Sequence, residues 1–363
     1  MAEHFVFEPN CKFAILAMHG VRADVPSDLI LKDGTRVLET FPFTLDDHWK
    51  DWLGTIQFSN LQASNLFLVR TATGGWPEGH LSISGGKVDE ELQSQLGGVF
   101  AMLRFLGTIE YENAFILGGH VVGGKPACRH FATTEPFKIT RGCLPWVVRE
   151  ADLRTAVELR EAYALLQKTS TDAERWRYGR GCYALKSAFE QYYASYRLHG
   201  FIRALEALIL PETGKTEKQF VSRCTLFAGP KSKESGIRGA LQEAYRMRCD
   251  IEHMHDWDRS LHTHPASERE NIALWRTRQM EELASAVYRK ILSDKTLQPN
   301  FHSDAATESF WKRPDDEIRA AFGNICDISQ LKIVKKYRSD WRADPSEWPP
   351  EMFENLRRKA KSA

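Results

Sequence analysis

Arg248 and His253 form an Arg-x4-His pattern near the end of a predicted helix, and their side chains are suited to acid–base chemistry on a phosphate ester. Histidine titrates near neutral pH, so it can take a proton from a hydroxyl group or return one to a leaving oxygen. Arginine stays charged and can hold two phosphate oxygens at once. Together they could promote cleavage of RNA by its own 2′-hydroxyl group, a reaction that requires no metal ion.

The spacing of the two residues restricts how they can form one site. Five residues of an ideal helix turn by about 500°, which leaves Arg248 and His253 about 140° apart. A joint site therefore requires His253 to lie on an uncoiled helix end, or a second chain to contribute its own copy. The alternative is structural: Arg248 would pair with Glu252, four residues on, and His253 would cap the C-terminus of the helix.

Two carboxylates lie between the arginine and the histidine. Either could orient a histidine, as carboxylates often do. We interpret Glu252 as part of a solvated helix face and leave both roles open for Asp250.

The surroundings of this motif resemble a known family. An Ala-Leu-Glu-Ala-Leu run that contains Glu206 comes first, followed by a Pro/Gly break, a helical stretch that contains Arg223, a polar linker, and Tyr245 just before Arg248. This order resembles the Apea-like branch of the HEPN superfamily, and the resemblance covers roughly residues 175–295. The family consists of helical-bundle proteins, many of which are metal-independent ribonucleases.

The resemblance implies a set of site residues. Arg248 and His253 align with the family's Arg-x4-6-His signature, and Tyr245 aligns with the aromatic residue before it. Glu206 and Arg223 match the family's helical glutamate and arginine. The sequence departs from the pattern at Cys249, where a small polar residue is common, and at Met254, where a glycine commonly follows the histidine. These departures bear on the geometry of the loop, and we keep Cys249 among the supporting candidates.

The resemblance also implies a function. We expect an RNA endonuclease without a metal or other cofactor, acting as a homodimer in which two copies of the motif face each other. The resemblance further implies a role in bacterial defence against phage, through toxic cleavage of RNA. A phage-derived trigger would then act on the N-terminal region. The alternative is a non-catalytic module that only dimerises or binds nucleic acid.

A histidine cluster near the motif raises the question of a metal site. The cluster contains His253, His255, His262 and His264, with Cys249 nearby, and imidazole and thiolate are the usual zinc ligands. The spacings match no standard zinc module, so we interpret these residues as loop histidines.

Two other motifs favour structural interpretations. Residues 119–125 nearly match a phosphate-binding loop, but Pro126 stands where a serine or threonine should follow, so we predict a hairpin turn. Residues 175–180 interleave arginines with aromatic residues, and we favour the buried face of a helix over base stacking. We likewise assign Tyr192, Tyr193 and Tyr196 to the core or to a dimer interface.

The elements that would position these residues follow from hydrophobic periodicity. Short apolar runs at 13–17, 66–69 and 114–117 predict strands, and one helix is expected at 88–106. From Asp152, a plausible N-cap, the pattern becomes helical. Helices are predicted over these ranges: 152–168, 172–196, 198–210, 216–228, 237–253 and 267–292.

The predicted fold class is therefore α+β. A β-rich domain (1–150) would serve as a sensor or specificity module and precede an all-α HEPN-like bundle (151–298). A short helical tail (299–363) would pack on the core, and its Trp341 and Trp348 would pack across the domains. The first region carries 13 Lys and Arg against 17 Asp and Glu, and the second 24 against 20, so their net charges are −4 and +4.

Composition limits the class of protein. Hydrophobic residues make up 42% and charged residues 27% of the 363 positions, which excludes a mainly disordered chain. The sequence contains no run of about 18 apolar residues, so it predicts no membrane span. Seven scattered cysteines argue against a disulfide scaffold, and residues 1–5 lack the pattern of a signal peptide. We therefore expect a cytoplasmic protein.

Overall fold

Strand β1 (Asn10–His19) lies inside the sheet and alternates its side chains between two hydrophobic cores. Phe13, Ile15 and Ala17 belong to one core, whereas Leu16 and its even-numbered neighbours belong to the other. Successive side chains of a strand point to opposite faces, so this sheet is covered on both sides. The computed structural model describes these residues: 7–26, 28–74, 87–106, 113–134, 147–170, 176–191 and 193–331.

The main sheet has six antiparallel strands in the order β3-β4-β5-β1-β6-β7. The remaining strands of this sheet are β3 (Leu29–Ile30), β4 (Arg36–Leu38), β5 (Ser64–Thr73), β6 (Asn113–Val122) and β7 (Lys125–Thr134). A separate parallel pair joins β2 (Arg22–Asp24) and β8 (Val147–Arg149). The three apolar runs that predicted strands therefore lie in β1, β5 and β6, as expected.

The near match to a phosphate-binding loop is a β-hairpin, as predicted. Val122 pairs with Lys125 across the β6–β7 turn, and Gly123 and Gly124 occupy it with φ of 56° and 79°. Two consecutive positive φ values suit a tight two-residue hairpin turn, and glycine adopts them without steric cost.

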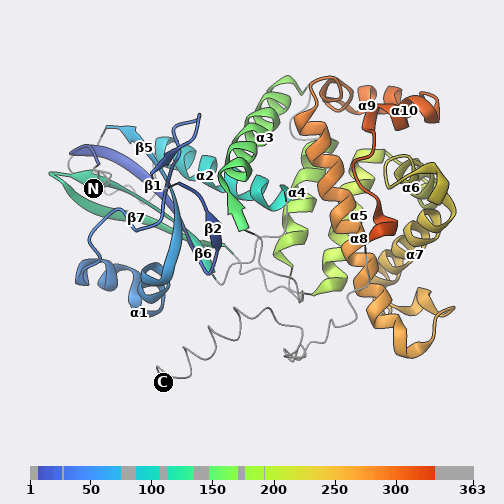
Figure 1. The fold of residues 1–363 in the computed structure, drawn as a ribbon, viewed down its shortest axis with the longest axis horizontal. Coiled ribbons are helices and arrows are strands. Elements are labelled where there is room, and N and C mark those ends of the chain that lie inside the picture. The colour runs from blue at the N-terminus through green and yellow to red at the C-terminus, as the bar shows by residue number, and fades with distance from the viewer. Residues whose placement is uncertain are drawn as a thin grey trace.

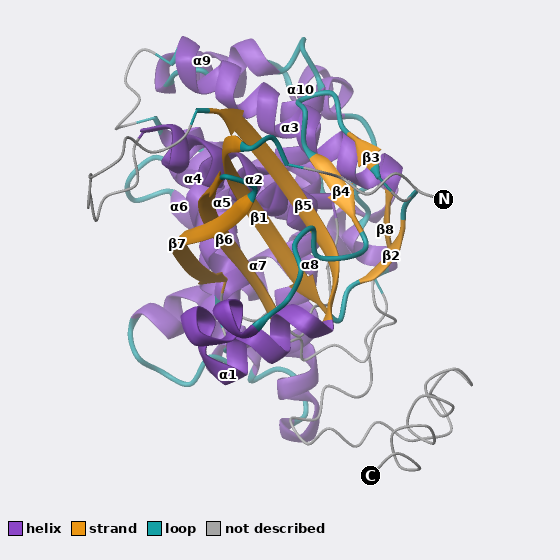
Figure 2. Cartoon of the chain, turned by 90° about the vertical axis from the view of Figure 1, so that its left-hand side faces the viewer, coloured by secondary structure: helices purple, strands orange, loops and turns teal. Residues whose placement is uncertain are grey.

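Helices lie on both sides of the sheet, with α1 in front of its lower end and most of the other helices behind it (Figure 2). Helix α1 (Asp47–Ala63) packs Trp49 and Leu61 on one face, and α2 (Lys87–Leu106) packs on the other. Helix α2 confirms the expected helix at 88–106. The sequence did not predict α1, which is interrupted at Gly54, where φ is 75°, and contains several residues that form helices poorly.

The helical region follows in the order shown in Figure 1. It contains α3 (Glu150–Thr169), α4 (Arg177–Glu190), α5 (Ala194–Ile209), α6 (Thr216–Thr225), α7 (Glu234–Glu252), α8 (Ala266–Ser293), α9 (Asp304–Trp311) and α10 (Asp315–Phe322), with short 3-10 turns η1 (Lys231–Lys233), η2 (Arg259–Leu261), η3 (Gln298–Asn300) and η4 (Ile328–Gln330). This arrangement of a sheet followed by helices confirms the α+β class. Residues 332–363, which include both tail tryptophans, lie outside the described residues.

Several predicted helix boundaries were wrong, since α5 begins at Ala194 rather than 198 and α6 ends at Thr225 rather than 228. Two others have a clear structural reason. The expected helix over 172–196 is α4, which ends at Glu190, because the chain turns there so that α5 can pack antiparallel to α4, with Gly200 tightly against Ala188. Helix α3 begins at Glu150 rather than after Asp152. Asp152 instead lies inside the first turn and accepts a hydrogen bond from the backbone N–H of Arg149 at 2.8 Å.

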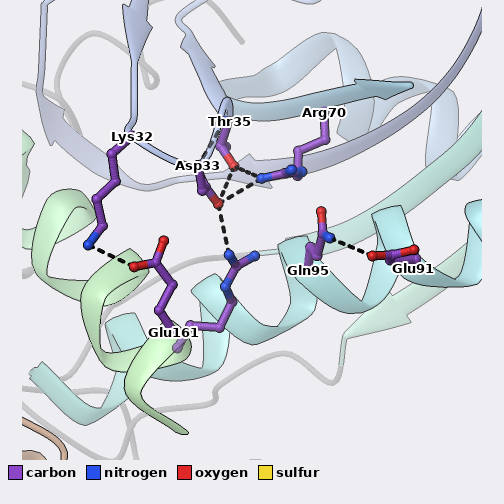
Figure 3. A network of polar contacts seen from close by, with 8 residues as sticks. Lys32, Asp33, Thr35, Arg70, Glu91, Gln95 and Glu161 are labelled. Carbon is purple, nitrogen blue, oxygen red and sulfur yellow. Dashed lines mark hydrogen bonds and ion pairs between the residues drawn. The ribbon is translucent and has the colours of Figure 1, made fainter. Parts of the chain in front are cut away.

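A continuous hydrophobic core links the sheet to the helical region. It extends from the α2 face of the sheet through α2 and α3 to α5, α7 and α8. A polar network reinforces this connection, because the buried side chain of Asp33, in the loop after β3, lies against Arg70 of β5 (Figure 3). The same carboxylate also lies against Arg160 of α3. None of the helices that the structure describes is long and apolar enough to cross a bilayer.

Candidate functional site

Helix α7 presents the candidate site at its C-terminal end. Its buried residues recur at helical spacing, from Ile237 through Leu241 and Ala244 to Met247, and hold the helix against the core. The helix ends at Glu252, and His253 adopts a non-helical conformation with φ of −89° and ψ of 11°. Met254 then takes a positive φ of 57°, a conformation that glycine adopts most readily at a helix end. His253 therefore lies on an uncoiled helix end, which is one of the two arrangements that a joint site with Arg248 requires.

Arg248 lies between two carboxylates. Its Nη2 is 3.1 Å from Oε2 of Glu206 on α5, and its Nη1 contacts Oε2 of Glu252 one turn further along α7. The guanidinium group lies 5.8 Å from the ring centroid of Tyr245. The hydroxyl group of Tyr245 donates to the other oxygen of Glu206 at 3.2 Å. Glu206 therefore holds both Tyr245 and Arg248 in place.

Electrostatics stabilise the charged form of this arginine. Burial lowers the pKa of Arg248, but the neighbouring carboxylates of Glu206 and Glu252 outweigh that effect, so the net shift is upward. The arginine side chain is 15% exposed, whereas that of Glu252 is 40% exposed. Glu252 is therefore the more solvent-accessible side of this ionic triad.

His199 is a site residue that the sequence did not reveal. Its Nε2 lies 3.3 Å from Oε1 of Glu252, so Glu252 bridges the imidazole of α5 and the guanidinium of α7. Our interpretation of Glu252 as a merely solvated residue was incomplete, because the exposed carboxylate has two specific partners. The only available signal was the seven-residue spacing of His199 and Glu206, which places both on one face of a helix.

His253 is exposed at the end of this network. Its ring centroid lies 6.3 Å from that of His255, which is also exposed. The backbone N–H of His253 donates to the carbonyl of Cys249 at 3.1 Å and so caps the helix with its main chain. The backbone of His253 thus closes the helix while its imidazole faces solvent.

Asp250 holds the loop that follows the helix. Its carboxylate accepts hydrogen bonds from the backbone N–H of Ser260, at 3.0 Å, and from the Ser260 hydroxyl group. The backbone carbonyl of Asp250 accepts a hydrogen bond from the N–H of His255 at 2.9 Å. These contacts fix the loop that begins at His253, so Asp250 is placed to support the position of the histidine through the backbone.

Two further candidates, Arg223 and Cys249, are not members of the ionic triad. The Arg223 guanidinium donates to the carbonyl of Leu210 at 2.9 Å and also to that of Ile209, which satisfies the end of α5. Burial lowers the pKa of Arg223. Cys249 is half-buried, and burial is the main reason that the pKa of its thiol is raised, so thiolate chemistry is disfavoured there.

The histidine cluster separates in the structure. His264 lies 2.9 Å from the carboxylate of Glu243, which also accepts a hydrogen bond from Arg276 at 2.8 Å, whereas His262 is exposed in the loop. Within the described ranges, no group of three or more His, Cys, Asp or Glu side chains could hold a metal ion. The six cysteines that the structure describes are all free.

Comparison with known proteins identifies no relative. The chain matches no protein-family model, no curated protein sequence and no solved structure. The chemistry of the site must therefore be argued from the geometry of the site alone. A charged guanidinium is positioned by two carboxylates, and an exposed imidazole lies at the end of the same helix.

Proposed function

We propose that this protein is a metal-independent RNA endonuclease whose site contains Arg248 and His253. The observation that carries the proposal is the exposed imidazole of His253 directly after Glu252, the residue that contacts Arg248. A positioned cation and an accessible acid–base group are the two components that cleavage by the 2′-hydroxyl group requires. The order of residues that resembles the HEPN ribonucleases adds to this support.

The proposed reaction begins when an imidazole removes the proton of the RNA 2′-hydroxyl group. The 2′-oxygen attacks the adjacent phosphorus, and the bond to the 5′-oxygen of the next nucleotide breaks. An imidazolium donates a proton to that leaving oxygen, and Arg248 stabilises the extra negative charge on the phosphoryl oxygens. The products carry a 2′,3′-cyclic phosphate and a 5′-hydroxyl group.

The reaction uses a base and an acid, and the resemblance to the HEPN ribonucleases favours two chains that each supply one of them. In a homodimer, His253 of one protomer would act as the base while the same residue of its partner acts as the acid. A substrate phosphate can contact Arg248 only by displacing Glu252, the more exposed of the two carboxylate partners of this arginine. We also infer that the protein acts in the cytoplasm, where its substrate would be found.

The test is cleavage of a single-stranded RNA by the purified chain in the presence of EDTA. His253→Ala should reduce the rate by about 10²–10⁴-fold, and Arg248→Ala by about 10²–10³-fold. Matched controls are His262→Ala, an exposed loop histidine, and Arg246→Ala, an exposed arginine of α7 that pairs with Glu217 instead. Both controls should cleave as the wild type does. Products with a 5′-phosphate would exclude this mechanism.

One observation favours a second candidate, a non-catalytic HEPN-like module. Arg248 already has two carboxylate partners, as a purely structural arginine would. In that case His253→Ala would leave every activity of the protein unchanged, and Arg248→Ala would reduce stability without any separate effect on RNA.

A further inference from the structure

The outward face of the α4–α5 hairpin has an unusual composition. The exposed side chains of α4 are Arg180, Tyr183 and Lys186, and those of α5 are Tyr196 and Arg203. Each exposed position of the two helices is therefore either a tyrosine or a cation. The sequence also interleaves arginines with aromatic residues at 175–180. There, however, Trp176 and Tyr178 are buried, as expected for a core-facing helix.

The tyrosines of this face leave large aromatic surfaces in water. Tyr183 is 71% exposed, Tyr193 in the α4–α5 connection is 61% exposed, and Tyr196 is 51% exposed. Tyr193 and Tyr196 meet edge to face, with ring centroids 6.0 Å apart. The core alternative was therefore wrong for these two residues, whereas the dimer interface stays a prediction. Tyr192 lies outside the described residues. Exposed aromatic clusters of this kind mark binding surfaces more often than single exposed residues do.

The hairpin lies beside the candidate site. Helices α5 and α7 run antiparallel, because Glu206 contacts Arg248 while the earlier residue His199 contacts the later residue Glu252. Tyr196 precedes His199 by three residues, or about 4.5 Å along the helix axis. It therefore lies past the end of α7, at the level of the turn that begins with His253. Residues 196, 199, 203 and 206 fall within about 80° of one another on α5, so they share one face.

The charge of the hairpin suits a polyanion. Residues 177–209 contain five Lys and Arg against two Asp and Glu, a net charge of +3. Both acidic residues already have cationic partners: Glu190 lies 3.5 Å from Arg104, and Glu206 contacts Arg248. The exposed cations Arg180, Lys186 and Arg203 form no ion pair with any residue that the structure describes.

We propose that this face binds an unpaired RNA strand and leads it to His253. The tyrosine rings would stack on bases, and the exposed cations would contact phosphates, which is the combination that single-stranded nucleic acids require. Stacking needs bases that are free of a duplex, so the substrate class is single-stranded RNA. This inference rests on the proposed function, and it adds that Tyr193 and Tyr196 position the strand without taking part in the chemistry.

The experiment measures binding of a 2′-O-methyl oligouridine, which lacks the attacking hydroxyl group and so cannot be cleaved. Tyr196→Ala and Tyr193→Ala should each weaken binding about tenfold, whereas Tyr196→Phe should bind as the wild type does because the ring remains. Lys186→Ala and Arg203→Ala should make binding less dependent on salt. Binding of duplex RNA should not change in the tyrosine variants.

The outcomes separate this inference from the proposed nuclease. Unchanged binding by Tyr193→Ala and Tyr196→Ala would overturn the inference, whatever the cleavage assay shows. A loss of binding that accompanies a change from dimer to monomer in light scattering would also overturn it, since the face would then be an interface between copies. If the tyrosines govern binding but His253→Ala leaves cleavage unaffected, the binding face stands and the proposed catalytic site fails.

Discussion

Two ionic triads, one at the junction of the sheet with helix α3 and one within the helical region, have opposite arrangements. At the junction one carboxylate, Asp33, lies 2.8 Å from Nη1 of Arg70 and 3.3 Å from Nη2 of Arg160. Within the helical region one guanidinium, that of Arg248, lies between two carboxylates. The same chemical groups therefore meet at both places with their numbers reversed.

The two triads differ in exposure. The Asp33 side chain is 5% exposed, and Thr35 adds a hydrogen bond from its hydroxyl group at 3.0 Å (Figure 3). This triad joins three separate elements and leaves little space for a ligand. The triad around Arg248 is open at Glu252, beside two exposed histidines. The buried triad is therefore suited to fixing the architecture, whereas the open triad can exchange a carboxylate for an external anion.

The largest effect on stability is expected from Asp33→Ala. Removal of this carboxylate leaves the guanidinium groups of Arg70 and Arg160 near each other without a buried counter-charge. Breaking a buried pair from one side typically costs about 3–5 kcal/mol. Urea unfolding monitored by circular dichroism measures this change in the free energy of unfolding.

The control for this prediction is Lys32→Ala. Lys32 lies 2.8 Å from the Glu161 carboxylate at the surface, next to the same network (Figure 3), and exposed pairs contribute only about 0–1 kcal/mol. Equal destabilisation by Asp33→Ala and Lys32→Ala would mean that burial does not determine the strength of this triad.

A smaller effect is expected from Glu206→Ala. This change leaves the Tyr245 hydroxyl group without its acceptor and removes one of the two partners of Arg248. Unsatisfied buried polar groups cost about 1–3 kcal/mol, and Arg248 retains Glu252. The same unfolding experiment applies, with Glu206→Gln as the variant that keeps one acceptor oxygen. If Glu206→Ala destabilised the protein as much as Asp33→Ala, the distinction between an open and a buried triad would be lost.

Sequence patterns predicted the elements that obey a clear local period, and they missed the short strands and α1. Apolar alternation marked β1, and helical spacing marked α2 and the long helices of the second region. The break between α4 and α5 had no glycine or proline at 187–196 to indicate it. It is set by a tertiary contact, the close approach of Gly200 to Ala188, which no local pattern contains.

The candidate site was predictable where its contacts are local. The pairing of Arg248 with Glu252 follows from their four-residue spacing, and the helix predicted over 237–253 ends within one residue of the observed end at Glu252. His199 was not predictable, because its partner is 53 residues away in the sequence. The triad around Asp33 is an extreme case, since its three members come from segments far apart along the chain and meet only in the folded protein.

Glu243 on α7 is a half-buried carboxylate outside the two triads, and its ionisation is expected to stabilise the helical region. Burial raises its pKa, but hydrogen bonds with His264 and Arg276 outweigh burial, so the pKa of Glu243 lies below its ordinary value. A lowered pKa in the folded state contributes stability above the pKa of the unfolded chain, about 4.3, and this contribution is lost as the pH falls through the folded-state value.

The measurement compares the wild type with Glu243→Gln in urea unfolding between pH 6 and pH 3. We expect the wild type to be the more stable protein at pH 6 and its advantage to shrink toward pH 3. A difference that stays constant over this range would show that ionisation of Glu243 is not linked to folding.

The smallest change in stability is expected from Glu252→Gln, and this variant tests the open triad directly. The 40% exposure of Glu252 limits its contribution to stability to about 0–1 kcal/mol. If an RNA phosphate must compete with Glu252 for Arg248, neutralising this carboxylate should tighten binding of a 2′-O-methyl oligouridine about two- to fivefold at low salt. The gain should decline at high salt, because exposed charges are screened.

The matched control for this last prediction is Glu217→Gln. Glu217 is similarly exposed and accepts a hydrogen bond from Arg246 of the same helix at 3.1 Å, so the substitution removes an equal charge near α7 without releasing Arg248. A gain in affinity confined to Glu252→Gln would identify competition at one guanidinium rather than a general effect of charge. Weaker binding by Glu252→Gln would instead mean that the carboxylate orients Arg248 for RNA, and the open triad would then resemble the one around Asp33 in fixing its arginine.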